Sequence, residues 1–157
     1  MSTSAGSLIL QANRFNNGGQ LQESVKAYLQ ALNCPMDQRS RFIVLYNLGN
    51  TYKSLGDNDS IMRNQRRCEA VQAWTEALSV HEGHSDRASA AMAAGEVLLE
   101  DGFFNRARSM FKLVIDYDNQ KGNLTAKAHA RLGITSSALS SSHSSSAKKR
   151  PGEKATK

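Results

Sequence analysis

The stretch from Leu45 to Asp57 constrains the fold most, because its pattern is that of an amphipathic helix with a glycine at its centre. Its apolar face recurs at i, i+3, i+4 and i+7 and consists of Leu45, Leu48, Gly49 and Tyr52. Glycine inside a helix costs about 1 kcal/mol relative to alanine. Because glycine lacks a Cβ, it is tolerated where a second backbone approaches closely. Gly49 therefore predicts a tightly packed partner helix.

A second apolar set downstream supplies that partner. It has helical spacing and consists of Ala70, Val71, Trp74, Ala77 and Leu78. Gly56 and Asp57 lie between the two sets and predict a helix end, since glycine is common just past a helix C-terminus. We therefore expect two antiparallel helices that close over the small residues Gly49 and Ala70.

This pair resembles the tetratricopeptide repeat, whose pattern combines Leu-Gly, Tyr, Ala and aromatic positions. The residues that carry the resemblance are Leu45, Leu48, Gly49, Tyr52, Gly56, Asp57, Ala70, Trp74 and Ala77. One spacing departs from the family. Gly49 and Ala70 are 21 positions apart, whereas the 34-residue unit has about 12. About nine extra residues therefore fall within Asp59–Cys68.

We expect the extra residues to lengthen the second helix at its N-terminus, with a flexible loop as the alternative. Ile61, Cys68 and Val71 can continue the apolar stripe that leads to Trp74. The basic residues of the insertion would then share a solvated face or reach past the edge of the array. These are Arg63, Arg66 and Arg67.

Two further helix pairs follow the same plan. One is predicted from helices at about 5–17 and 21–33, and the other begins near residue 85. Their small residues are 12 positions apart, as in the repeat: Ala12 and Ser24 in the first pair, Gly95 and Ala107 in the last. Ser40 and Ser85 are the expected N-caps of the second and third pairs, because serine is a favoured capping residue.

The resemblance implies an all-α fold, a right-handed superhelical array of antiparallel helix pairs with about seven helices. The expected units are 5–38, 39–84 and 85–122, followed by a capping helix at 123–139. That helix contains Leu132-Gly133 but has no mate, and repeat arrays need such a terminal element. Residues 1–4 are expected to fray. The Ser-rich basic tail, 140–157, is expected to be disordered because it has no apolar residue able to offset the ordering entropy.

The net charge of +6 is concentrated at the C-terminus. From His143 onward there are five Lys or Arg and one Glu, a local +4, which leaves about +2 for the rest. Lys148, Lys149 and Arg150 resemble a short nuclear-import signal, although such runs are commonly only solvated. Two cysteines are too few for a disulfide framework, and no apolar run is long enough for a membrane span. We expect an intracellular protein, in the cytoplasm or nucleus.

If the resemblance holds, the first helices of the pairs line a concave groove. The positions three before, one after and four after each small residue point into it. They are Ile9, Asn13, Asn16, Tyr46, Asn50, Lys53, Met92, Glu96 and Leu99, here called the predicted partner surface. Asn13 and Asn50 suit a peptide backbone, since an amide both donates and accepts. The expected function is a non-catalytic protein–protein interaction module or small scaffold subunit of a multiprotein complex, which binds a peptide or helix of another protein.

Other readings stay open. A co-chaperone-like adaptor would grip acidic chaperone tails, but repeats of that type have Lys or Arg where this chain has Ile9, Met92 and Glu96. Glu96 would repel a carboxylate. A nuclear nucleic-acid-associated factor would use the basic tail, yet no aromatic residues interleave there to stack on bases. Self-association through the terminal helices is a further alternative.

The sequence carries no pattern for catalysis, a cofactor or a metal. His81 and His84 lie three apart without a plausible third ligand, and zinc needs three or four. There is no Gly-rich phosphate loop and no nucleophile elbow. We therefore expect no enzymatic activity, no cofactor and no metal.

Overall fold

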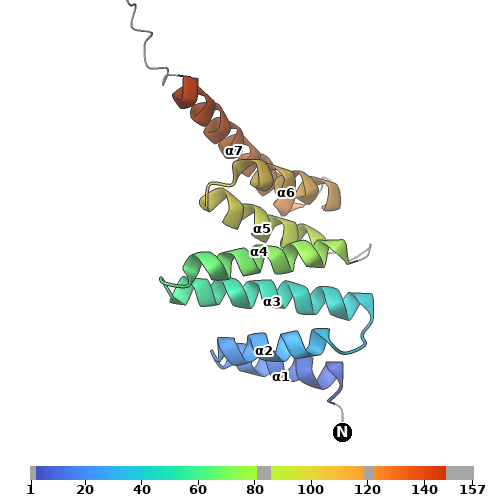
Figure 1. Ribbon diagram of the computed structural model, residues 1–157. Helices are drawn as coiled ribbons and strands as arrows, with labels where there is room; N and C mark the ends of the chain where they lie inside the picture. Colours follow the sequence, from blue (N-terminus) through green and yellow to red (C-terminus); the bar gives the residue numbers. More distant parts are fainter. Residues whose placement is uncertain (1–2, 81–85, 119–121, 148–157) are drawn as a thin grey trace, which may run out of the picture.

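The computed structural model describes residues 3–80, 86–118 and 122–147 of the chain. Within these residues it contains seven α-helices and no strand (Figure 1). The helices are α1 (Ala5–Asn17), α2 (Leu21–Leu32), α3 (Gln38–Asn58), α4 (Arg63–Ser79), α5 (Arg87–Glu100), α6 (Phe104–Tyr117) and α7 (Asn123–Ala147). They pack in adjacent pairs, α1 with α2, α3 with α4 and α5 with α6, and α7 contacts both α6 and α5. The prediction of an all-helical fold built from adjacent pairs is confirmed for this part of the chain.

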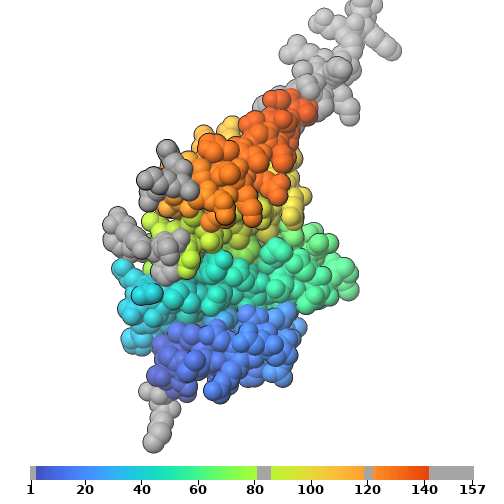
Figure 2. All heavy atoms as spheres, turned by 180° about the vertical axis from the view of Figure 1, so that it is seen from behind, coloured from blue at the N-terminus to red at the C-terminus, as the bar shows by residue number. Residues whose placement is uncertain are grey.

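The pairs follow one another in sequence order along a single stack. Figure 1 shows α1 and α2 at one end and α7 at the other, and Figure 2 shows the same order from behind. One core cluster joins α1, α2 and α3 around Ala12, Tyr28 and Leu48, with Ala73 of α4. The second joins α3 to α6 around Trp74 and Phe111 and includes Ala128 of α7. Each pair therefore buries its apolar faces against the next.

Two of the pairs close where a glycine of the first helix receives an aromatic ring of the second. A Cβ added to Gly49 would lie 2.4 Å from Nε1 of Trp74, and one added to Gly95 would lie 2.6 Å from Cε1 of Phe111. Trp74 and Phe111 are both fully buried. Since real Cβ atoms do not come so close to ring atoms, only glycine permits this helix spacing.

The first pair closes by a hydrogen bond at the equivalent position. Ala12 and Ser24 are fully buried, and the Ser24 hydroxyl donates to the Ala12 carbonyl oxygen over 2.9 Å. The predicted close approach at Ala12, Gly49 and Gly95 is thus present in all three pairs. Gly133, the equivalent position of α7, is exposed, and a Cβ there would meet nothing within 4 Å. Among the described residues, no helix closes over Gly133.

The turns inside the pairs differ in their chemistry. Gly19 and Gly102 adopt positive φ values of 77° and 86° in the α1–α2 and α5–α6 turns, where a Cβ would be strained. The α3–α4 turn has no such glycine. There Asp59 Oδ1 accepts hydrogen bonds from the backbone N–H groups of Ile61 and Met62, over 3.0 and 3.3 Å.

Helix α3 differs from its prediction at both ends. It begins with Asp37 rather than Ser40 as its N-cap, and the Asp37 carboxylate accepts a hydrogen bond of 2.7 Å from the Ser40 N–H. That bond holds the pKa of Asp37 below its ordinary value. At the other end the helix continues through Gly56 to Asn58. Gly56 does not end the helix: it is buried where α4 approaches, and an added Cβ would lie 3.1 Å from the Cβ of Arg66.

The insertion lengthens the second helix at its N-terminus, as predicted, because α4 begins at Arg63. The expected apolar stripe through it is wrong. Ile61 lies in the turn with 90% of its surface exposed, and Cys68 is exposed on α4. The expected solvated basic face is also wrong at Arg67, of which only 3% is exposed. Residues Glu100 and Asp101, at the end of α5, lie against Arg67 and compensate its charge.

The ends of the third unit and of the capping helix also differ from prediction. Helix α5 starts at Arg87 after Asp86, and the expected cap, Ser85, lies outside the described residues. Helix α7 runs to Ala147, past the expected end near residue 139. No Gly or Pro interrupts residues 134–147, and hydroxyls such as Ser141 donate to the carbonyl four residues earlier. Serine alone therefore does not stop this helix.

Candidate interaction surfaces

The predicted partner surface lies on the first helix of each pair, and its members differ in how far they reach the solvent. Most are partly exposed: Ile9, Asn13, Asn16, Tyr46, Asn50, Lys53, Glu96 and Leu99. Met92 is only 5% exposed and belongs to the core cluster. Helix α5 lies between other helices, with α4 on one side and α6 and α7 on the other. Met92 therefore has almost no surface to offer a ligand.

In the first pair Asn13 serves the fold as well as the surface. The buried hydroxyl of Tyr28 donates to Asn13 Oδ1. Burial raises the pKa of the Tyr28 phenol, and side-chain hydrogen bonds with Asn47 and Ser24 partly oppose the rise. The Asn13 side chain is thereby held in one orientation, and its amide N–H donors are not used in this bond.

In the second pair the surface combines a ring and a charge. The rings of Tyr46 and Phe42 are stacked, with centroids 6.2 Å apart and planes within 9°. Lys53 Nζ forms an ion pair of 2.9 Å with Asp57 Oδ2 on the same helix. Asn50 lies between Tyr46 and Lys53 in the sequence and is partly exposed. This helix therefore offers an aromatic ring, an amide and a paired cation.

In the third pair the surface is partly covered by α7. Arg131 of α7 approaches Glu96 of α5, with 3.7 Å between Nε and Oε1. Leu99 packs against the core cluster. An acidic ligand would be repelled by Glu96 here, and no Lys or Arg of α5 stands in its place. This surface therefore lacks the cations with which a co-chaperone-like adaptor would bind acidic chaperone tails.

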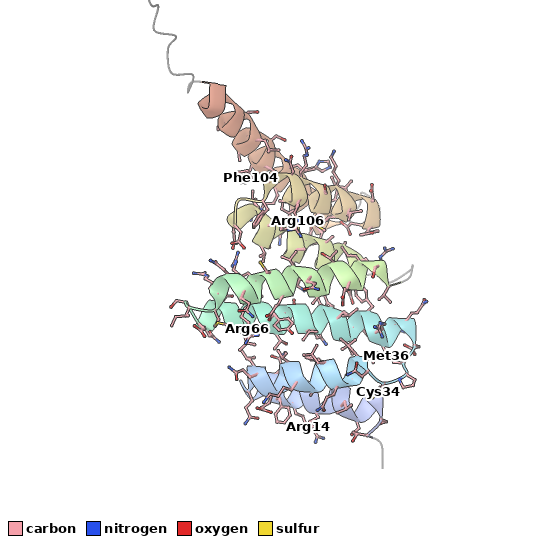
Figure 3. All side chains as sticks on the ribbon, viewed as in Figure 1. Arg14, Cys34, Met36, Arg66, Phe104 and Arg106 are labelled. Carbon is pink, nitrogen blue, oxygen red and sulfur yellow. The ribbon has the colours of Figure 1, made fainter. Side chains whose placement is uncertain are left out.

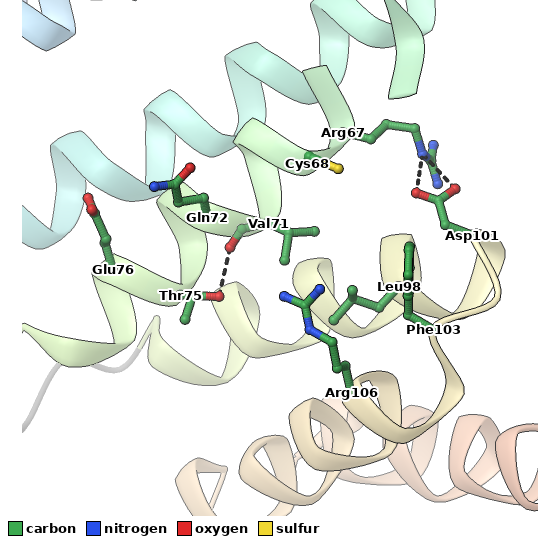
Figure 4. A pocket seen from close by; sticks show the side chains of 10 residues that line it. All are labelled: Arg67, Cys68, Val71, Gln72, Thr75, Glu76, Leu98, Asp101, Phe103 and Arg106. Carbon is green, nitrogen blue, oxygen red and sulfur yellow. Dashed lines mark hydrogen bonds and ion pairs between the residues drawn. The ribbon is translucent and has the colours of Figure 1, made fainter. Parts of the chain in front are cut away.

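A second surface was not predicted from the sequence. A groove of about 440 Å³ lies where α4, the end of α5 and α6 meet, and Figure 4 shows it from close by. Its lining side chains are Arg67, Cys68, Val71, Gln72, Thr75, Glu76, Leu98, Asp101, Phe103 and Arg106. Here it is called the α4–α6 groove. Its size falls within the range of pockets that hold small ligands or single side chains.

Arg67 closes one end of this groove. Its Nε donates to the two Asp101 oxygens over 3.0 and 3.1 Å, and its Nη2 donates to Glu100 Oε2 over 2.7 Å. Burial alone would lower the pKa of Arg67, but these hydrogen bonds outweigh it and raise the pKa above its ordinary value. Arg67 thus ties α4 to the α5–α6 turn and is not available to a ligand.

Comparison with known proteins gives no family: no protein-family model matches the sequence, and no curated protein shows significant similarity to it.

The described residues show no metal cluster, since no three His, Cys, Asp or Glu side chains come together in a way that could hold an ion. His81 and His84, and the basic residues Lys148, Lys149 and Arg150, lie outside the described part of the chain. None of the described helices has the length and apolar character that a membrane span requires.

Proposed function

We propose that this protein is a non-catalytic protein–protein interaction module, a tetratricopeptide-like right-handed array that binds a peptide or helix of another protein. The observation that carries the proposal is the repeated closure of three helix pairs at Ala12, Gly49 and Gly95. This repetition gives the first helices α1, α3 and α5 the same register. The side chains three positions before, one after and four after each small residue therefore fall at equivalent places along the stack.

The second pair is the best candidate for the main contact. Tyr46 and Asn50 are partly exposed, and an aromatic ring beside an amide can supply both apolar area and hydrogen bonds to a peptide. Aromatic residues of this kind are common energetic anchors in protein interfaces. A role as a small subunit of a larger complex rests on the same surface.

Affinity purification with mass spectrometry tests this proposal. We expect the wild type to retain a set of partner proteins that the Tyr46→Ala/Asn50→Ala variant loses. A matched control, Lys26→Ala/Gln30→Ala, changes two exposed residues of α2, on a different helix of the stack. Circular dichroism would show that all three proteins are folded. Retention of the same partners by the Tyr46/Asn50 variant would contradict the proposal.

The co-chaperone-like adaptor and the nuclear nucleic-acid-associated factor gain less support. The adaptor needs cations on α1 and α5, where this chain has Ile9, the buried Met92 and Glu96 paired with Arg131. Nucleic-acid binding would rest on the basic tail. It predicts an affinity that falls steeply with salt and is lost when residues 143–157 are removed.

A further inference from the structure

The α4–α6 groove can be understood by comparing the third helix pair with the second. Measured from the small residues of each pair, Leu98 of α5 is equivalent to Tyr52 of α3. On the second helices, Phe103 is equivalent to Arg66 and Arg106 to Glu69. In the third pair these three side chains face α4, the second helix of the preceding pair.

In the second pair the three side chains bind one another. Arg66 and Glu69 form an ion pair of 2.9 Å, with only 25% and 26% of the two side chains exposed. The Arg66 guanidinium also lies 6.0 Å from the centre of the Tyr52 ring. Figure 3 shows Arg66 near the end of α4 that adjoins the α3–α4 turn. The chain therefore covers this ring with its own ion pair.

In the third pair the side chains at the same positions form no such ion pair over a ring. Leu98 is smaller than the tyrosine it replaces, Phe103 is 50% exposed, and Arg106 takes the place of the acidic partner. The Arg106 guanidinium lies 5.9 Å from the Phe103 ring and reaches from α6 toward α4 (Figure 4). Among the described residues no carboxylate forms an ion pair with Arg106. What the second pair has and the third lacks is an aromatic ring at the position of Leu98 with an acidic group beside it, at the position of Arg106.

We propose that the α4–α6 groove binds a peptide segment of a partner protein in which a large apolar side chain lies next to an Asp or Glu. The apolar side chain packs on the half-exposed Phe103 ring, in the groove whose floor is formed by the buried Val71 and Leu98, and the carboxylate pairs with Arg106. Such a charge-assisted hydrogen bond is about twice as strong as a neutral one. Glu76 at the other end of the groove repels a second carboxylate and so sets the direction of the segment.

The charge of Arg106 argues against the chain's own C-terminus as the occupant. Residues 148–157 carry five Lys or Arg and a single Glu, so they match Arg106 in sign. This site is separate from the predicted partner surface, which lies on the first helices, and the two proposals can fail independently.

The test uses a phage-displayed library of random peptides, selected on the full-length protein. We expect enriched peptides to carry a Phe, Tyr, Trp or Leu beside an acidic residue. Their affinity should fall about tenfold or more in Arg106→Glu. The double variant Phe103→Arg/Arg106→Glu copies the ion pair of the second pair into the groove and should lose binding as well. Arg108→Glu is the control, because it makes the same charge change at an exposed residue of α6 that does not line the groove.

The two cysteines report where the peptide binds. Cys68 lines the groove, whereas Cys34 lies in the α2–α3 connection, at the opposite end of the helices from Arg66 (Figure 3). A peptide in the groove should slow the reaction of Cys68 with a thiol reagent and leave that of Cys34 unchanged. The proposal is overturned by enriched peptides without acidic residues, by equal affinity for Arg106→Glu, or by an unprotected Cys68. It is also overturned by a wild-type dimer that Arg106→Glu separates, since the occupant is then a second copy.

Discussion

The second and third helix pairs close in the same way and differ in the side chains around that closure. Gly49 receives Trp74 as Gly95 receives Phe111, so the backbone plan is repeated. The equivalent outer positions are filled by Tyr52, Arg66 and Glu69 in one pair and stay open around Leu98, Phe103 and Arg106 in the other. The fold therefore depends on the few residues at which the two helices of each pair pack most closely, whereas the side chains on the surface differ from pair to pair.

The largest expected effect comes from breaking the closure itself. Gly49→Ala places a Cβ 2.4 Å from Trp74 Nε1, and we expect a loss of about 2–3 kcal/mol in the free energy of unfolding. The control is Gly133→Ala, at the same Leu-Gly position of α7 with nothing within 4 Å, which should gain up to about 1 kcal/mol. Thermal or denaturant unfolding measures both. Equal stabilities for the two variants would contradict the shared closure.

A smaller effect is expected from Arg67, which joins the second pair to the third. Arg67→Ala removes three hydrogen bonds to Glu100 and Asp101 and should cost about 2 kcal/mol. Arg67→Met keeps the aliphatic volume and should recover part of that loss. Arg63→Ala, on the same helix but exposed, should change stability by less than about 0.5 kcal/mol. Denaturant unfolding of the three variants checks the order.

The ion pair that covers Tyr52 is expected to contribute less again. A double-mutant cycle with Arg66→Ala and Glu69→Ala should give a coupling of about 0.5 kcal/mol. The more exposed pair Lys26–Glu23, with side chains 67% and 51% exposed, should couple more weakly. A coupling energy of zero between Arg66 and Glu69 would contradict the claim that this ion pair forms over the Tyr52 ring.

The smallest effect is a pH dependence confined to alkaline solution. Burial raises the pKa of Tyr28 and of Tyr52 above 10.0; for Tyr52, Glu69 adds to the rise and Arg66 opposes it. Since the fold favours the neutral phenols, their contribution is complete below the unfolded pKa of about 10 and is lost as the pH rises through the folded values. Stability measured between about pH 9 and 11 should decline above about 10, and less so in Tyr28→Phe/Tyr52→Phe. An identical decline in the variant would contradict this assignment.

The pair closures could be predicted from the sequence because they depend on local spacing. Gly49 and Trp74 lie at fixed positions of an amphipathic pattern, and a glycine in the middle of a helix is by itself a sign of a close neighbour. The same reasoning found Ala12 and Gly95. The insertion does lengthen α4 at its N-terminus as predicted, but the apolar stripe through Ile61 and Cys68 that suggested this is absent.

The features that were missed depend on contacts between distant parts of the chain. Arg67 is buried because Glu100 and Asp101, over thirty residues later, come to lie against it. Met92 is buried because helices on both sides of α5 cover it. The α4–α6 groove needs Val71, Leu98 and Arg106 from three helices. No single-helix pattern contains these neighbours, although the missing acidic partner of Arg106 was visible as a difference between equivalent positions.

The repeated closure of the helix pairs is the claim on which the proposals rest, and proton NMR tests it without disturbing the fold. An aromatic ring displaces the resonances of protons that lie against it. We predict that the Hα signals of Gly49 and Gly95 are displaced from their ordinary positions by the Trp74 and Phe111 rings, whereas those of Gly6 and Gly133 are not. Ordinary positions for all four glycines would contradict the account.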